Sequence, residues 1–180
     1  MPTATVPSGI EDVTSSWLSE VLEAPVGEVR AERIAMDTGF SARLYRVHLT
    51  GSRVPESVIV KLPADSEARG AMELMGGYTR EVAFYREIAG RAPIGTPKVY
   101  AAQVADEGSD FVLVLEDLRD WENVDHLAGL TLDQARLVIA QLAGLHAWSA
   151  EPPNTVLGQS FPSIDTPMMR DVLPAVFAQG

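Results

Sequence analysis

Alternating and clustered apolar residues predict that the first two thirds of the chain are rich in strands. Five segments have this pattern between polar connections that contain Gly or Pro. We predict a strand over each of them: residues 29–36, 42–50, 57–63, 98–105 and 111–118. Apolar residues at helical spacing predict helices over residues 14–23 and 78–89. A helical region is also expected between the strand 57–63 and the helix 78–89, with a break at Gly76-Gly77. The predicted order after the first helix is therefore three strands, a helix and two strands.

The pattern changes after residue 118, where a long helix is predicted. Thr131 and Gln134 have the spacing of a capping box, in which each side chain bonds to the other residue's backbone at the helix start. The helix runs to about Ser149, and its apolar residues lie on nearly every side. Such a helix has to be covered on several sides. Residues 151–165 predict a linker, and a last helix is expected from residue 166.

Composition narrows the class of protein. The chain has 180 residues, of which 46% are hydrophobic, so a packed core is expected. It has no apolar run long enough to span a membrane and no basic-then-apolar segment at its start, so we expect a cytoplasmic protein. The net charge of -11, without a local basic patch, argues against nucleic acid or a membrane surface as partner. The absence of cysteine excludes disulfides and thiolate metal sites.

A lysine closes one of the most apolar stretches, SVIVKL at residues 57–62. Because a buried ammonium is costly unless it is paired, Lys61 either points outward to water or is held inside by a partner. Glu81, on the following predicted helix, could reach it from above the sheet, and the pair would hold the ammonium where it could touch a phosphate. A tight turn at Gly39 would let backbone amides approach phosphate oxygens. The backbone that leaves the strand 111–118 is suited to binding the edge of a purine.

Several motifs in a fixed order carry a resemblance to a known family. They are GFSARLYRVHL, SVIVKLP, YTREVAFYREI, GTPKVYAA, FVLVLEDL and LAGLHAW. In this order they resemble the aminoglycoside phosphotransferase and choline/ecdysteroid kinase-like family of the protein-kinase-like superfamily, over residues 34–149. The resemblance implies an α+β fold, with a kinase-like N-lobe of five antiparallel strands plus helix over residues 1–118. Residues 119–180 would form the first helices of an incomplete helical C-lobe.

The resemblance implies which residues bind the phosphates of ATP. Lys61 resembles the lysine that holds the α- and β-phosphates, and Glu81 resembles its ion-pair partner. Gly39, Phe40 and Ser41 would lie in the loop that covers the phosphates. That loop has one glycine here instead of the three of G-x-G-x-x-G, so a plain turn glycine remains an alternative for Gly39.

The resemblance likewise implies an adenine pocket. Ile59, two residues before the lysine, would pack on the adenine ring, and Leu115 would lie at the back of the pocket. The backbone carbonyl of Glu116 and the backbone amide of Leu118 would bind adenine, with Asp117 between them. In the alternative interpretation, Glu116 and Asp117 are ordinary acids that cap the next element.

Phosphoryl transfer also needs Mg²⁺ ligands and a residue that positions the acceptor hydroxyl. In the family these come from a later H-G-D-x-x-x-x-N loop and a DFG-like Asp. None of the three histidines here is followed two residues on by Asp, and Asp165 is preceded by no such loop. No metal ligand is therefore assigned. We expect the chain alone to be inactive, as a truncated product, a fragment or one piece of a split enzyme.

The function implied by the resemblance is ATP-dependent phosphorylation of a hydroxyl on a small metabolite or an aminoglycoside-like acceptor. The alternative is a non-catalytic module that binds a nucleotide or another protein, and a weaker one is a structural domain without a ligand. The apolar helix over residues 131–149 would contact either the remaining C-lobe or another chain.

Overall fold

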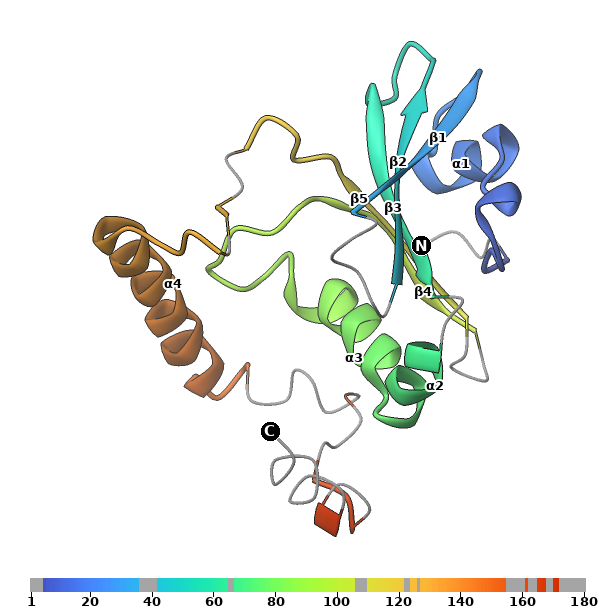
Figure 1. Cartoon of the computed structure of the whole chain (residues 1–180). Coiled ribbons are helices and arrows are strands. Elements are labelled where there is room, and N and C mark those ends of the chain that lie inside the picture. Colours follow the sequence, from blue (N-terminus) through green and yellow to red (C-terminus); the bar gives the residue numbers. More distant parts are fainter. Residues whose placement is uncertain are drawn as a thin grey trace.

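A computed structural model describes residues 5–35, 42–64, 67–105, 110–121, 124–125, 127–154, 161, 165–167 and 170–171. In it, a five-stranded sheet lies between helix α1 on one face and helices α2 and α3 on the other (Figure 1). The helices are α1 (Ser15–Leu22), α2 (Glu67–Leu74), α3 (Gly77–Ala83) and α4 (Leu132–Ala150). The strands are β1 (Val29–Ile34), β2 (Ala42–Leu49), β3 (Ser57–Pro63), β4 (Val99–Val104) and β5 (Phe111–Glu116), and a short 3₁₀ helix covers Ile10–Asp12.

The sheet has the order β1-β2-β3-β5-β4, and each neighbouring pair is antiparallel. This confirms the predicted α+β architecture with five antiparallel strands. β5 lies between β3 and β4. Because β5 runs antiparallel to β3, its end lies beside the start of β3, where Val58 pairs with Glu116. β5 ends at Glu116, two residues earlier than predicted, because Asp117 and Leu118 leave the ladder. The predicted turn over residues 37–41 lies outside the described residues.

The two faces of the sheet bury separate apolar cores, because successive side chains of a strand point to opposite faces. The outer face packs against α1, and its fully buried members include Val47, Val58 and Val60. The inner face packs against α3 and includes Leu113 and Leu115 from β5. We call these the outer and inner faces below.

The helical region over the inner face is broken at the predicted place and differs from the prediction after α3. Gly76 has a left-handed backbone (φ 63°), which glycine adopts without strain, and it separates α2 from α3 where the sequence predicted a break. After α3 the chain continues as a π-helical turn, Phe84–Ile88, instead of an α-helix to residue 89. The backbone amide of Ala89 donates to the carbonyl of Phe84 at 2.9 Å, which is the wider bond of a π turn. Arg86 Nε donates to the carbonyl of Ala102 at 2.7 Å and ties this turn to β4.

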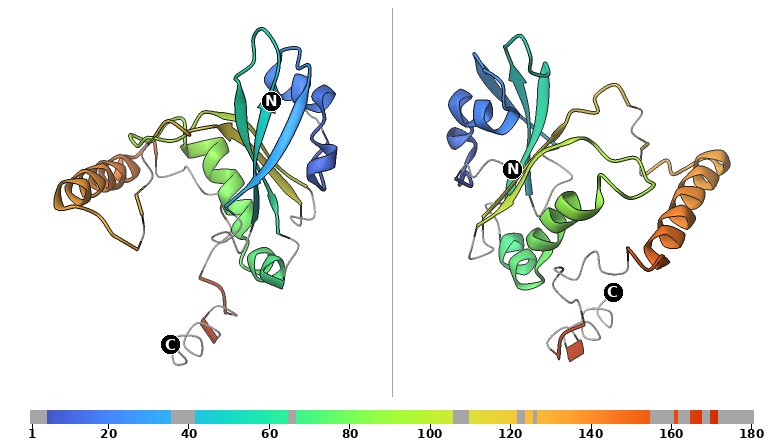
Figure 2. Two further views of the ribbon diagram at one scale, coloured as in Figure 1. Left: turned by 45° about the horizontal axis from the view of Figure 1, so that its top comes forward. Right: turned by 180° about the vertical axis from the view of Figure 1, so that it is seen from behind.

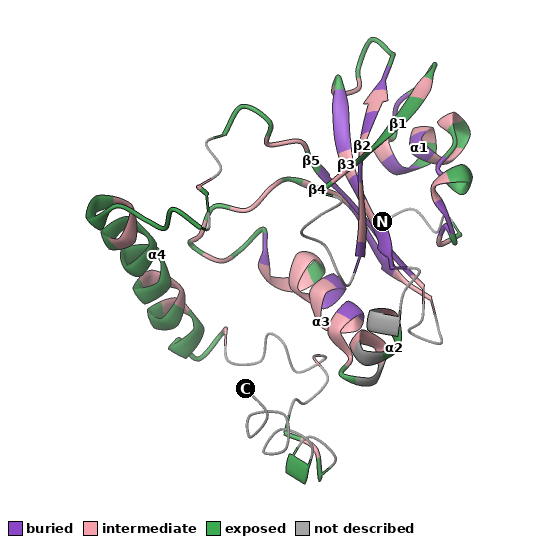
Figure 3. Ribbon diagram, in the orientation of Figure 1, coloured by how far each residue is buried: buried purple, intermediate pink, exposed green. Residues whose placement is uncertain are grey.

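Helix α4 begins as predicted, with the capping box of Thr131 and Gln134 in place. It stands apart from the sheet in every view (Figure 2). None of its described residues is buried, and most of its length is coloured as exposed, with shorter intermediate stretches (Figure 3). The described residues therefore do not provide the cover that its apolar surface predicts. None of the described helices is both long and apolar enough to cross a membrane.

Candidate functional site

An ion pair joins the sheet to helix α3 on the inner face. Lys61 Nζ lies 2.5 Å from Glu81 Oε1. Lys61 faces inward because it shares the strand phase of Ile59, which packs on the inner core. The two side chains are 21% and 28% exposed, so both are partly withdrawn from water but still reachable. Lys61 therefore does not point outward to water: it is held on the inner face by its partner Glu81.

Aliphatic side chains lie directly beside this pair. Ile59 is opposite Leu115 in the ladder between β3 and β5, and Lys61 is opposite Leu113. Leu115 is buried, whereas Ile59 is half-buried at the edge of the inner core. The inner face thus presents a cation and an apolar surface within one strand, two residues apart.

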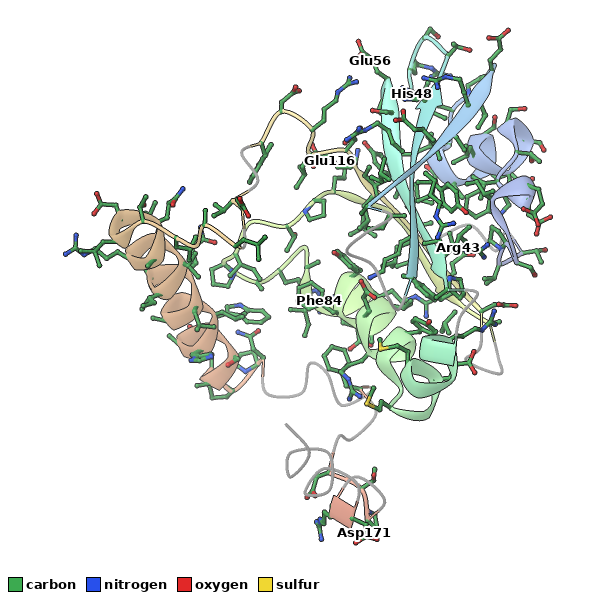
Figure 4. The ribbon with its side chains drawn as sticks, in the orientation of Figure 1. Arg43, His48, Glu56, Phe84, Glu116 and Asp171 are labelled. Atoms are coloured by element: carbon green, nitrogen blue, oxygen red, sulfur yellow. The ribbon has the colours of Figure 1, made fainter. Side chains whose placement is uncertain are left out.

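The segment that leaves β5 is fixed at its first residue. The backbone amide of Glu116 donates to the carbonyl of Lys98 at 2.8 Å, and the Glu116 carboxylate accepts from the amide of Lys98 at 3.0 Å. Glu116 lies where β5 gives way to the segment that runs toward α4 (Figure 4). Further on, the amide of Trp121 donates to the carbonyl of Leu118 at 2.9 Å. Within the part of the chain that is described, no hydrogen bond uses the backbone amide of Leu118.

Asp117 has a role for its side chain that the sequence did not reveal. Arg46 Nε on β2 donates to its carboxylate at 2.7 Å, and Ser57 Oγ on β3 donates to it at 2.7 Å. Burial acts to raise the pKa of Asp117, but the hydrogen bonds from Arg46 and Ser57 outweigh it and hold that pKa below its ordinary value. The same hydrogen bond to Asp117 raises the pKa of Arg46. Asp117 is therefore ionised at neutral pH.

A hollow of about 510 Å³ lies against α3 on the side of the ion pair, and Glu81, Phe84 and Tyr85 are among the residues that line it. A second hollow of about 500 Å³ includes Lys98 and Glu116 in its lining, and Tyr85 borders both. Burial raises the pKa of Tyr85, and the charge of Glu81 adds to the rise. Neither hollow includes Lys61 or Ile59 in its lining.

The loop expected to cover the phosphates does not enter this geometry. Gly39, Phe40 and Ser41, expected to cover the phosphates, lie outside the described residues. Among the residues that are described, no cluster of three or more His, Asp or Glu side chains could hold a metal ion.

Sequence reasoning missed Arg46 and Ser57. The signal available was a charged residue in the inward phase of residues 42–50, where Leu44 and His48 share its face. Only the ladder register shows that Arg46 lies opposite Ile59 and within reach of Asp117. Such register between distant strands cannot be read from local periodicity.

The sequence was also compared with families and proteins already described. A family model described as the ecdysteroid kinase-like family matches residues 37–156, which is two thirds of the chain. The comparisons with curated proteins and with solved structures gave no match to this sequence. The matched span begins in the segment before β2 and includes β2 to β5 and α4.

Proposed function

The chain belongs to the ecdysteroid kinase-like family, a kinase-like family, and from this we propose that it is the ATP-binding part of a small-molecule phosphotransferase. The reaction of the complete enzyme is transfer of the γ-phosphoryl group of ATP to a hydroxyl of a small metabolite or an aminoglycoside-like acceptor. Residues 1–118 form the nucleotide-binding lobe, and residues 119–180 begin a helical lobe. We propose a cytoplasmic location, as the sequence led us to expect.

The observation that carries the proposal is the Lys61–Glu81 ion pair on the inner face. A carboxylate from an overlying helix fixes the ammonium and leaves its remaining N–H donors for a ligand, because Lys has three donors. Phosphate oxygens are strong acceptors for such a donor. In the proposal, Lys61 binds the α- and β-phosphates and Glu81 holds it in place. Gly39, Phe40 and Ser41 cover the phosphates from above.

In the same proposal, the adenine base of ATP binds to an apolar surface and to two backbone groups after β5. The half-buried Ile59 packs on the adenine ring, with Leu115 behind it. The backbone carbonyl of Glu116 accepts from the adenine amino group, and the backbone amide of Leu118 donates to a ring nitrogen. The absence of a hydrogen-bond partner for the Leu118 amide among the described residues supports this assignment.

We further propose that this chain binds nucleotide without transferring phosphate by itself. The 180 residues contain no His followed two residues on by Asp, and the described residues offer no metal cluster. Positioning of the acceptor hydroxyl and of Mg²⁺ is a separate requirement of phosphoryl transfer. No residue of this chain is assigned to it.

The test is nucleotide binding by two matched variants, because the chain has only two lysines, Lys61 and Lys98. Lys98 lies over the ring of Tyr100, 4.9 Å from its centre. Lys61→Ala should weaken ATP binding by at least about tenfold, since a charge-assisted hydrogen bond contributes roughly 1.5–3 kcal/mol. Lys98→Ala removes the same charge elsewhere and should leave the affinity within about twofold of wild type. Titration calorimetry measures both.

Equal ATP affinity in wild type and Lys61→Ala would refute the role of the lysine. A second assay separates binding from catalysis: the chain is incubated with Mg-ATP and a panel of amino-alcohol and sugar-like acceptors, and ADP release is followed. We expect no turnover. Acceptor-dependent ADP release by this chain alone would overturn the proposal that it does not transfer phosphate by itself.

A second candidate function is protein interaction through α4, and the exposure of that helix favours it. Its exposed apolar residues are Leu132 (67%), Leu137 (66%), Val138 (53%), Ile139 (65%) and Leu142 (47%). Apolar surface of this extent is typical of an interaction site. We propose that it contacts the rest of the helical lobe or another chain. In this candidate the sheet binds nucleotide without catalysis.

A further inference from the structure

A buried carboxylate fixes the segment that leaves β5. The side chain of Asp117 is only 4% exposed, although it stands just beyond the end of the strand. Both of its oxygens are used: Arg46 donates from Nε to Oδ2 at 2.7 Å and from Nη2 to Oδ1 at 3.2 Å. Ser57, itself 5% exposed, donates from Oγ to Oδ2 at 2.7 Å. Three donors from two other strands thus converge on one carboxylate.

This arrangement is more than a capping interaction. An acid that caps a helix accepts from backbone amides of the next few residues, whereas Asp117 accepts from side chains 71 and 60 positions away in the sequence. A two-pronged bond from arginine to a carboxylate also fixes orientation, because the planar guanidinium holds both oxygens at once. The carboxylate therefore locks the direction in which the chain leaves the sheet.

The cluster lies on the inner face beside the proposed base surface. Arg46 is directly opposite Ile59 in the ladder between β2 and β3, and Ile59 is two residues before Lys61. The locked segment runs from Glu116 through Asp117 to Leu118. On one side Glu116 is tied to Lys98, and on the other the carbonyl of Leu118 accepts from Trp121.

We propose that Asp117, Arg46 and Ser57 are positioning residues for purine recognition, and that they hold the backbone of residues 116–118 in the conformation that binds the base. The proposal rests on ATP binding at the inner face. A preorganised backbone binds more tightly because less conformational entropy is lost on binding. We call Asp117, Arg46 and Ser57 the clamp. The clamp affects binding of the base alone, since Lys61 binds the phosphates independently. Removing the clamp should therefore change the affinity for ATP much more than the affinity for its phosphate chain.

The experiment compares the affinities of ATP and inorganic tripolyphosphate, each measured by displacement of a fluorescent ATP analogue from the purified chain. Asp117→Asn keeps the shape and removes the charge. Glu56→Gln is the matched control, because Glu56 pairs with Arg119 at 2.6 Å near the same segment but is 86% exposed (Figure 4). Ser57→Ala is a milder variant that removes one donor and leaves the ion pair intact. Thermal unfolding establishes that each variant is folded at the temperature of the measurement.

We expect Asp117→Asn to weaken the binding of ATP by about tenfold. Its affinity for tripolyphosphate should stay within about twofold of wild type. Ser57→Ala should move the same ratio in the same direction by less, and Glu56→Gln should leave it unchanged. If Asp117→Asn and Ser57→Ala both keep the wild-type ratio of the two affinities, the clamp has no role in base recognition. Failure of the wild-type chain to bind ATP is a different result, because it overturns the proposed function and, with it, the purpose of the clamp.

Discussion

Two ion pairs on the inner face differ in how far water reaches them. The side chains of Lys61 and Glu81 are 21% and 28% exposed, whereas Arg46 is 28% exposed and its partner Asp117 only 4%. A partly exposed pair gains little net stability, because solvent screens it and the two side chains lose rotamer freedom. A buried carboxylate depends on its donors, since its loss of hydration has to be offset. We therefore expect the Lys61 pair to matter mainly for ligand binding and the Asp117 cluster for stability as well.

The cluster predicts a pH dependence of unfolding. Because hydrogen bonds from Arg46 and Ser57 hold the pKa of Asp117 below its ordinary value of 3.8, protonation is easier in the unfolded chain. Its contribution is fully present above about pH 5 and is lost as the pH falls through about 4 and then through the lower folded pKa. Asp117→Asn should be less stable than wild type at pH 7, and the difference should shrink toward pH 3. Urea midpoints at pH 7, 5 and 3 measure this.

Glu56→Gln is again the control, because the 86% exposed carboxylate of Glu56 should show no such convergence. A difference between wild type and Asp117→Asn that stays constant from pH 7 to pH 3 would contradict a depressed pKa in the folded protein. The direction of the pH dependence is informative, because a carboxyl group whose pKa was raised by burial alone would give the opposite trend.

Within the elements, the start of α4 is held by local hydrogen bonds. The amide of Gln134 donates to Thr131 Oγ1 at 3.2 Å, and the amide of Thr131 donates to Gln134 Oε1 at 2.9 Å. Because no described residue of α4 is buried, the cap is a large share of what stabilises the helix start. Thr131→Ala should destabilise that start by about 1 kcal/mol, while Thr131→Ser keeps the oxygen and most of the effect. Backbone hydrogen exchange over residues 132–136 measures it, and equal protection in all three chains would contradict it.

Elements whose ends are set by nearby residues were predictable from the sequence. The cap at Thr131 placed the start of α4. The alternation of residues 42–50 groups Tyr45, Val47 and Leu49 on one face of the strand, and in the structure this face packs in the outer core. The sequence also suggested the Lys61–Glu81 pair, since an unpaired lysine on an apolar strand would be costly.

Features that depend on distant neighbours were missed. β5 ends at Glu116, and the carboxylate of the next residue, Asp117, accepts hydrogen bonds from Arg46 and Ser57 on two other strands. The apolar spacing of residues 78–89 did not reveal the π turn at Phe84–Ile88, because one added residue barely changes a short helical pattern. The roles given to Gly39, Phe40 and Ser41 stay predictions.

At the scale of the whole molecule, the sheet with its helices and the separate helix α4 are stabilised in different ways. The sheet buries an apolar core on each face, whereas α4 leaves its apolar side chains in water as far as the structure is described. Burying a Val or Leu side chain contributes roughly 1.5–3 kcal/mol. The free energy available from covering α4 is therefore large enough to drive association.

This predicts that the isolated chain associates through α4. Val138 and Leu142 are four residues apart, so they share one side of the helix, and they are 53% and 47% exposed. Replacing both by Gln should weaken self-association by at least about tenfold, because two apolar contacts are lost. Arg136→Gln is the control, since it changes an exposed polar residue of the same helix. Sedimentation velocity over a micromolar concentration series measures the effect. A wild-type chain that stays monomeric throughout would mean that this face does not bind a second copy, and a partner would then have to be sought in the rest of a helical lobe.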